Sequence, residues 1–266
     1  ELPFETLLQQ LEKAEIRFPL IAKPDVGERG FLVQKIETAD LLRQHLERYP
    51  VPFIVQEFLE QPLEMSILFH QIPDNGRFQI TSICVKEFLQ VTGDGVSTIR
   101  ALMQQNSRAA FQLERFEQEK PDLLNPTPAS GETILLEPIG HHIRVTKFLN
   151  GNHLISPELE AVFRQVCRGI DGVLYGRFDL KCASVEALLR GEFQVMELNG
   201  ILGEPAHVFD PNHGMWRAYR DYYRHWKILY GLHQAQLARG IRPTSHREAW
   251  QFIRQYFRYK KYLESR

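Results

Sequence analysis

The stretches GVLYGRFDLKC (172–182) and EFQVMELNG (192–200) decide the fold of this 266-residue chain. Each is typical of a strand, and each carries two polar residues at positions i and i+2: Arg177 with Asp179, and Glu197 with Asn199. Side chains two residues apart on a strand point to the same face of the sheet. If the two strands are neighbours, one surface presents two carboxylates, a carboxamide and a guanidinium.

Such a surface has two interpretations. Several hard oxygen ligands together suit Mg2+, which prefers carboxylates in combination with phosphate oxygens and water. A salt-bridged sheet face in contact with solvent would carry the same residue types. These four residues alone leave both interpretations open.

Two upstream segments favour a nucleotide site. A buried-looking strand, FPLIAKP (18–24), leads into the loop KPDVGERG (23–30), whose glycines permit the backbone conformations of a phosphate-covering loop. The loop is neither a Walker A sequence nor a GxGxxG fingerprint. Next, VQEFLEQPLE (55–64) places Glu57 and Glu64 seven residues apart, at the end of one strand and the start of another.

The remaining pattern predicts a mixture of helices and antiparallel strands. We expect helices over 4–15, from Thr38 to about 49, from Ser97 or Thr98 onward, and over about 157–170. The turn DNG (74–76) between two apolar runs predicts a hairpin, and the proline-rich stretch 118–131 predicts an exposed loop. Aromatic residues at helical spacing from 215 to 230 predict a helix, with the aromatic stripe as its core-facing side. Ser245 and Glu248 form a capping box that opens a last helix to about residue 263.

Composition bounds the class of protein. With 43% hydrophobic and 24% charged residues, the chain has the composition of a globular protein. Its three cysteines, Cys84, Cys167 and Cys182, are widely spaced and outside any CxxC pattern, which indicates a reducing, cytoplasmic compartment. No apolar run reaches the roughly 20 residues that span a bilayer, so we expect no membrane span.

The charge is balanced overall but unevenly distributed. Lys and Arg total 32 against 33 Asp and Glu, for a net charge of -1, so no global field attracts nucleic acid or a membrane. From Arg217 to the end, however, the chain has twelve basic and three acidic residues, a net charge of +9. Residues 1–216 therefore carry a net charge of -10. The basic C-terminal part predicts contact with an acidic partner, a second copy of the chain included.

Taken in order, KPDVGERG, VQEFLEQPLE, RFDL and ELNG resemble the ATP-grasp ligases, with D-alanine:D-alanine ligase as the nearest pattern. The resemblance covers roughly residues 16–212. The segment VTGDGVSTIRAL (91–102) is similar to the GDG segment in the ATP-grasp portions of cyanophycin synthetase and bifunctional glutathione synthase.

The resemblance implies an α+β (α/β) ATP-grasp fold, in which two subdomains hold the nucleotide between them, followed by a C-terminal helical extension. The corresponding divisions are a helical lead-in over 1–18, a small lid subdomain over 19–67, a large subdomain with the metal site over 68–212, and the basic extension over 213–266. ATP-grasp enzymes have a preceding domain that this chain lacks, so we expect a fragment, a domain supplied by another chain, a homodimer, or impaired activity.

The resemblance also implies roles for individual residues. Lys23 contacts the ATP phosphates and serves in catalysis with Arg177, which stabilises charge on the transferring phosphoryl group. Glu64 holds the ribose, and Lys86 is a second phosphate-contacting lysine. The loop over the phosphates comprises Gly27, Glu28, Arg29 and Gly30; the adenine hinge comprises Gln56, Glu57, Phe58 and Leu59; and the Mg2+ ligands, with Mn2+ as the alternative ion, are Asp179, Glu197 and Asn199.

Substrate residues are expected on either side of the two metal strands. Arg144, His142 and Lys147 precede them, and Glu204 and His207 follow them. Arg144 is the best candidate for a substrate carboxylate, because its planar fork binds one through two hydrogen bonds. For each histidine, an ordinary structural or surface role is the alternative.

The implied function is an ATP-dependent carboxylate-amine ligase that joins amino-acid or peptide substrates through an acylphosphate. Two alternatives remain open at this point: an ATP-binding module without ligase activity, and a protein that binds RNA, an acidic protein or an anionic membrane surface through its basic C-terminal helices.

Overall fold

The structure, a computed structural model, describes residues 3–27, 30–73, 76–137 and 146–264. Contacts between residues divide the chain into two compact units: unit 1 is Glu1–Glu60 with Gln236–Arg266, and unit 2 is Gln61–Ala235. The first strand of the large sheet begins at Leu63, so the predicted division between 67 and 68 falls inside that strand.

Unit 1 is built on a three-stranded antiparallel sheet of order β2-β1-β3. Its strands are β1 (Leu20–Pro24), β2 (Gln34–Ile36) and β3 (Phe53–Glu57), and its helices are α1 (Phe4–Lys13), α2 (Ala39–Arg48) and α9 (His246–Glu264). Thr38 caps α2, as predicted, by accepting a hydrogen bond from the backbone of Leu41. The apolar face of the sheet packs against α1 and α2 through a core centred on Leu11, Leu20, Ala22, Ile36 and Leu42.

Unit 2 contains a five-stranded antiparallel sheet of order β10-β9-β4-β5-β8. The strands are β4 (Leu63–Gln71), β5 (Phe78–Glu87), β8 (Lys147–Asn150), β9 (Tyr175–Cys182) and β10 (Phe193–Asn199). β4 and β5 form the predicted hairpin, although Asp74 and Asn75 of its turn lie outside the described residues. The fold class is therefore confirmed as a mixture of helices and antiparallel sheet.

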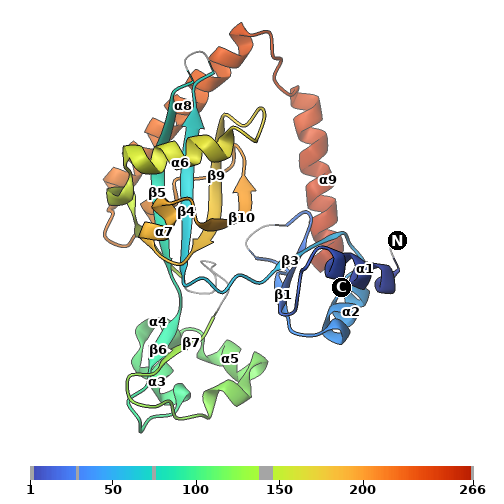
Figure 1. Ribbon diagram of the computed structural model, residues 1–266, viewed down its shortest axis with the longest axis vertical. Helices are drawn as coiled ribbons and strands as arrows, with labels where there is room; N and C mark the ends of the chain where they lie inside the picture. The colour runs from blue at the N-terminus through green and yellow to red at the C-terminus, as the bar shows by residue number, and fades with distance from the viewer. Residues whose placement is uncertain (1–2, 28–29, 74–75, 138–145, 265–266) are drawn as a thin grey trace. The chain divides into compact units, whose positions relative to one another are not determined.

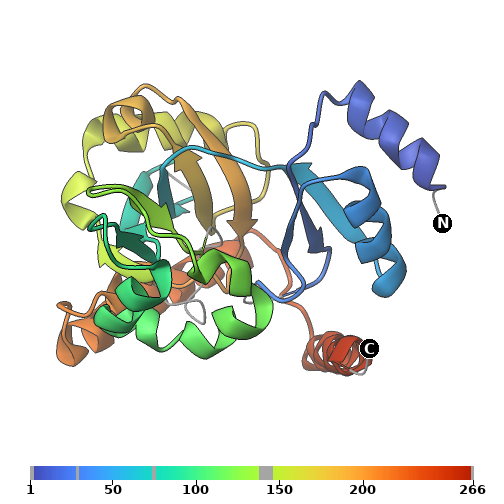
Figure 2. The ribbon, with the colours of Figure 1, turned by 90° about the horizontal axis from the view of Figure 1, so that it is seen from below.

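Helices cover the two faces of this sheet in different ways. One face is apolar and packs against α6 (Pro157–Cys167) and α7 (Val185–Leu189), forming a core that includes Ile67, Phe69, Phe163 and Phe178. Figures 1 and 2 show α6 and α8 (Met215–Ala238) on opposite sides of the sheet. The face away from α6 is polar over much of its length, and α8 packs on part of it through Leu68, Tyr175 and Leu232.

A smaller subdomain in unit 2, green in Figures 1 and 2, packs short helices on a two-stranded sheet. It comprises β6 (Gln90–Thr92), β7 (Thr133–Leu135), α3 (Ile99–Gln105), α4 (Ser107–Ala110), α5 (Leu113–Glu119) and the 3-10 helix η1 (Pro121–Leu124). The predicted exposed loop at 118–131 is wrong in part, because Leu124 is fully buried in this core. Pro121 follows the end of α5 and is the first residue of η1.

The GDG segment forms a tight turn before α3. A Cβ atom at Gly93 would clash with the carbonyl oxygen of Ala129, so only glycine fits there. Asp94 accepts hydrogen bonds from the backbone of Val96 and Ser97 and from the Ser97 hydroxyl, which lower its pKa to about 2. In the described residues, the GDG segment therefore has a structural role: it forms the turn before α3 and packs against the loop that follows η1.

The C-terminal part is helical, as predicted, and the capping box is present: Ser245 and Glu248 hydrogen-bond reciprocally. The expectation that the aromatic stripe of α8 faces a core is wrong, since Trp216, Tyr219, Tyr223 and Trp226 are exposed. The face that packs is a narrower stripe of shorter and polar side chains, at Asp221, Tyr222, His225, Ile228, Leu229 and Leu232. Within the described residues, no helix has the length and hydrophobicity needed to cross a membrane.

Candidate active site

The candidate site lies on the polar face of the five-stranded sheet. Strand alternation directs Met65, Ile67 and Phe178 into the core beneath α6, and directs the residues between them to the other face. The register then places Glu64 opposite both Lys86 and Lys181, and Ser66 opposite Asp179. Residues from three adjacent strands thus meet on one surface, where a core-forming sheet would have apolar side chains.

Glu64 and Lys86 form a buried ion pair at one end of this face. The Lys86 Nζ atom lies 2.6 Å from Oε1 of Glu64, and both side chains are less than a tenth exposed. Burial on its own would lower the pKa of Lys86, but the nearby carboxylates of Glu64 and Asp179 outweigh it, and the pKa is raised. Lys86 is therefore a fixed positive charge at neutral pH.

Lys181, which the sequence analysis missed, joins this group from the neighbouring strand. Its Nζ atom lies 3.9 Å from Oε2 of Glu64, and burial lowers its pKa. A signal for it existed in the sequence: Lys181 follows Asp179 at i+2 in the same strand and so shares its face.

Half-buried Arg177 and buried Asp179 form a second ion pair nearer the middle of the sheet. The guanidinium donates from Nε to Oδ1 at 2.9 Å and from its terminal nitrogen to Oδ2 at 3.0 Å, a two-point contact. Burial would raise the pKa of Asp179, but Lys86 and Arg177 outweigh it and hold the pKa below its ordinary value. Asp179 is consequently a carboxylate at neutral pH.

Strand β10 adds Glu197 and Asn199 to the same face. Glu197 pairs with Asp179 and Asn199 pairs with Arg177, so both side chains point toward the Arg177–Asp179 pair. The Asn199 amide lies 3.5 Å from Oδ2 of Asp179, and Glu197 is exposed. The four residues predicted to share one surface do share it.

A β-bulge makes this arrangement possible. Val195 pairs with Leu180 and Glu197 pairs with Asp179, so β10 has one more residue than β9 between these two pairs. Phe193, on the near side of the bulge, packs into the core with its ring centroid 5.0 Å from that of Phe163. Without the extra residue, strict alternation would place Phe193 and Glu197 on the same face.

In unit 1, Lys23 lies on the sheet face opposite to the core. It pairs with Ile54 of β3, and Gln56 pairs with Ile21, so Lys23 and Gln56 share that face. Glu57 ends β3, and Phe58 lies beneath Lys35, whose Nζ is 4.4 Å from the ring centroid. Leu59 follows in the chain and is half-buried. The four consecutive residues from Gln56 to Leu59 are those predicted for the adenine hinge.

The predicted phosphate loop begins directly after β1. Gly27 is exposed and Gly30 has a φ of 70°, a conformation that glycine adopts without strain. Glu28 and Arg29, predicted to belong to the same loop, lie outside the described residues.

The predicted substrate residues have different surroundings. Lys147 is on β8 and pairs with Glu87 at 3.0 Å. The backbone carbonyl of Glu204 accepts a hydrogen bond from Arg177 at 3.4 Å, and its side chain is exposed. His207 is buried, and its ring nitrogens contact Ser82 at 2.7 Å and Asp221 at 3.2 Å. His142 and Arg144 are outside the described residues.

Comparison with known proteins gives structural likenesses only. No family model matches the sequence, and no curated protein matches it. Among solved structures, a bifunctional glutathione synthetase from Pasteurella multocida aligns at 13% identity and a TM-score of 0.42, over 85% of this chain and 33% of that protein. The D-Ala:D-Ser ligase VanG from Enterococcus faecalis aligns at 16% and 0.45, over 86% and 53%. The D-alanine–D-alanine ligase from Bacillus anthracis aligns at 15% and 0.41, over 90% and 58%.

These proteins are of the kind that the four sequence motifs resemble. The chain spans between one third and three fifths of the length of the structures it matches.

Proposed function

We propose that the chain is an ATP-grasp carboxylate-amine ligase that uses ATP and Mg2+ to form an amide or peptide bond. One observation carries this proposal: the polar face of the five-stranded sheet gathers buried Lys86 and Asp179 and half-buried Arg177 beside Glu197 and Asn199. Removing charged side chains from water costs free energy, so a protein seldom buries several of them together unless they bind something. A face with this mixture of cations and oxygen ligands suits a polyphosphate and its metal ion.

Each residue has a proposed role. Lys86 and Arg177 neutralise phosphate oxygens, and Glu64 accepts hydrogen bonds from the ribose hydroxyls. In unit 1, Lys23 contacts phosphates, the loop from Gly27 to Gly30 covers them, and the backbone of Gln56–Leu59 hydrogen-bonds the adenine. Lys147, Glu204 and, outside the described residues, His142 and Arg144 contact the substrates. These assignments follow from the motif resemblance and from the positions described above.

The donor set fits magnesium. Asp179 and Glu197 are carboxylates on paired positions of adjacent strands. The carboxamide of Asn199 lies next to them, with its nitrogen 3.5 Å from Oδ2 of Asp179, and its oxygen is the atom that would bind the ion. Such hard oxygen ligands favour Mg2+ or Mn2+ over softer metals. The ion, when bound by these three residues, would supply charge neutralisation for the phosphates. The exposure of Glu197 leaves its carboxylate accessible to an incoming complex.

The proposed reaction has two balanced steps. An oxygen of the substrate carboxylate attacks the γ-phosphorus of ATP, the bond to the β-γ bridging oxygen breaks, and ADP leaves with that electron pair. The amine of the second substrate then attacks the carbonyl carbon of the acylphosphate, inorganic phosphate leaves, and the amine loses a proton. The chain's part is positioning and charge stabilisation: the fixed cations of Lys86 and Arg177 oppose the negative charge that develops on the transferring group.

A substrate panel tests the proposal. We would measure ADP and phosphate release by the full chain with MgATP over single amino acids, amino-acid pairs and short peptides. Release that requires both an acid and an amine, and that falls at least 100-fold in Glu197→Gln, supports the ligase. Glu192→Gln is the matched control, because Glu192 is an exposed acid just before the same strand and pairs only with the surface residue Arg190 among its described contacts.

The same panel includes the outcomes that contradict the proposal. ATP binding without turnover on any acid and amine would indicate a nucleotide-binding module. Equal loss of release in Glu192→Gln and Glu197→Gln would show a general effect of charge and not a role for the metal ligands.

A further inference from the structure

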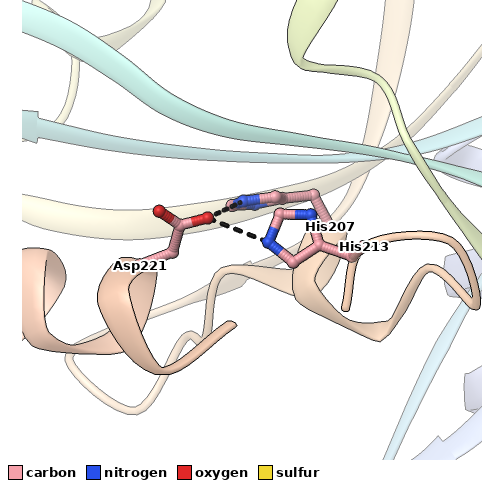
Figure 3. Close-up of side chains that lie close together, drawn as sticks. All are labelled: His207, His213 and Asp221. Carbon is pink, nitrogen blue, oxygen red and sulfur yellow. Dashed lines mark hydrogen bonds and ion pairs between the residues drawn. The ribbon is translucent and has the colours of Figure 1, made fainter. Parts of the chain in front are cut away.

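A second group of ligand-type side chains lies on the polar face, away from the candidate active site. His207 is in the short helix η4 (Ala206–Phe209), His213 is just before α8, and Asp221 is in the second turn of α8. Figure 3 shows both imidazole rings directed at one oxygen of Asp221. The Nε2 atoms of His207 and His213 lie 3.2 and 2.9 Å from that oxygen.

The group is buried and well supported. His207 is 2% exposed and His213 is 7% exposed. Asp210 fixes the segment between them, accepting hydrogen bonds from the backbone of Asn150 and Asn212, each at 2.7 Å. The segment that carries the two histidines is therefore held against the end of β8 through contacts that do not involve the imidazoles.

The outer contacts suit metal ligation. The Nδ1 atom of His207 lies 2.7 Å from the Ser82 hydroxyl on β5, a partner that can fix the ring orientation and leave Nε2 directed inward. Next to this group, His225 contacts the Thr81 hydroxyl at 3.1 Å and the Asp221 carbonyl at 2.7 Å, and so holds α8 against the same strand.

The spacing of the three donor atoms matches a tetrahedral site. Ligand atoms around a zinc ion with bonds of about 2.0 Å lie roughly 3.3 Å apart. Two of the three spacings here are 3.2 and 2.9 Å, and all three atoms lie within 4.8 Å of one another. The imidazole planes are inclined by 89°, so the rings approach the carboxylate edge-on from two directions and do not stack on each other.

We propose that His207, His213 and Asp221 bind a divalent transition-metal ion of the zinc class, with a water molecule at the fourth position. Two imidazole nitrogens are borderline donors that suit zinc, and zinc also accepts a carboxylate oxygen, whereas Asp179, Glu197 and Asn199 offer hard oxygens alone. The ion would connect α8 to η4 and, through Ser82, to β5. Ser82 is four residues from Lys86 in sequence, about 13 Å along the strand, so the two sites are separate.

The site is independent of the proposed ligase reaction, and its test needs no substrate. The full chain would be treated with a chelator, freed of it, and titrated with Co2+ and then Zn2+ in the presence of excess Mg2+, which occupies the all-oxygen site. Tetrahedral Co2+ absorption reports the ligand geometry, and competition by Zn2+ reports affinity and stoichiometry. The three free cysteines are buried, and burial raises the pKa of Cys84 to about 12 and of Cys167 to about 11, so their thiols remain protonated during the titration.

Three variants make the test specific. His213→Gln retains a hydrogen-bond donor to Asp221 but removes a ligand nitrogen, and Asp221→Asn retains the shape but removes the charge. His233→Ala, an exposed histidine on the same helix, is the matched control.

We expect one ion per wild-type chain with a tetrahedral Co2+ spectrum. Zn2+ binding should be at least tenfold weaker in both site variants and unchanged in His233→Ala. A wild-type chain without saturable binding, or with an octahedral Co2+ spectrum, would overturn the proposal even if a variant failed to fold. Equal Zn2+ affinity in wild type and in His213→Gln would also overturn it, and would leave the three residues as a hydrogen-bonded clamp on α8.

Discussion

Glu64 is the residue whose charge is most enclosed on the polar face. It lies between Lys86 at 2.6 Å and Lys181 at 3.9 Å, and its side chain is 6% exposed. A buried ion pair contributes little net stability compared with apolar residues, but the loss of one partner leaves the other charge buried without compensation.

Glu64→Gln should therefore lower the free energy of unfolding by about 3 kcal/mol, because Lys86 loses its nearest counter-charge. Urea unfolding at neutral pH measures this. Glu192→Gln breaks an exposed pair with Arg190 and should leave the unfolding midpoint unchanged. Similar midpoints for the two variants would show that solvent screens the Glu64–Lys86 pair.

His70 is a buried histidine that makes stability depend on pH. Burial, together with the nearby His225, Arg224 and Arg77, lowers its pKa from 6.5 to about 4. The folded state therefore binds fewer protons than the unfolded state between pH 6.5 and 4. Stability from this group is present above the unfolded pKa and is lost as the pH falls through that window.

Between pH 7 and 5, His70 should account for a loss of about 2 kcal/mol of unfolding free energy. His70→Gln, which keeps a polar side chain but does not titrate, should reduce the acid-induced loss by that amount. Urea titrations of both proteins at the two pH values measure the difference. An identical pH dependence in the two proteins would mean that His70 is protonated in the folded state or that its neighbours compensate.

Strand β10 shows which part of the site could be predicted from sequence and which could not. The i, i+2 spacing of Glu197 and Asn199, and of Arg177 and Asp179, correctly indicated that each pair shares a face. The strand register is a different matter, because it depends on the bulge at Met196, where Phe193 must face the core while Glu197 faces the site. Local sequence contains the residue types but not the pairing that selects between the two faces.

Gly176 on β9 permits β10 to approach closely at the position of Asn199. A Cβ atom there would lie 3.0 Å from the Asn199 carbonyl oxygen and 3.1 Å from a methyl group of Leu198. Gly176→Ala should displace the end of β10 by a few tenths of an ångström and move Asn199 away from Asp179. Small misplacements at a reacting centre reduce rates strongly, by up to about 100-fold.

We therefore expect Gly176→Ala to lower MgATP-dependent turnover by at least tenfold with a much smaller change in the thermal midpoint. Gly169→Ala is the matched control, since its Cβ would meet its nearest neighbour at an ordinary 3.7 Å. Steady-state rates and thermal melts of both variants decide the point. Full activity in Gly176→Ala would mean that the position of Asn199 is not critical.

Much of the architecture could be predicted from capping residues, turn residues and the periodicity of apolar residues. The caps at Thr38 and Ser245, the β4–β5 hairpin and the long C-terminal helices were predicted because each depends on a few neighbouring residues. The core around α3 to α5 and the face on which α8 packs depend on contacts between distant segments. Leu124 and the exposed Trp216 were accordingly predicted wrongly.

The basic and acidic residues that make the charge distribution uneven lie in different parts of the structure. In the described part of the chain, α8 presents aromatic and basic side chains to solvent, while its packed stripe carries Asp221 and His225. The acidic part of the chain includes Glu64, Asp179 and Glu197, which have proposed roles on the polar face. The -10 and +9 thus belong to segments with different surroundings, and the net charge of -1 conceals both.

The central claim is that the chain activates a carboxylate as an acylphosphate. Hydroxylamine tests this directly, because it replaces the unknown amine and traps the intermediate as a hydroxamate. With MgATP and a panel of amino acids and short peptides, we expect at least one acid to give hydroxamate and ADP in equal amounts, and Glu197→Gln to give neither. ATP binding without hydroxamate from any acid, by a chain that remains folded, would contradict the account.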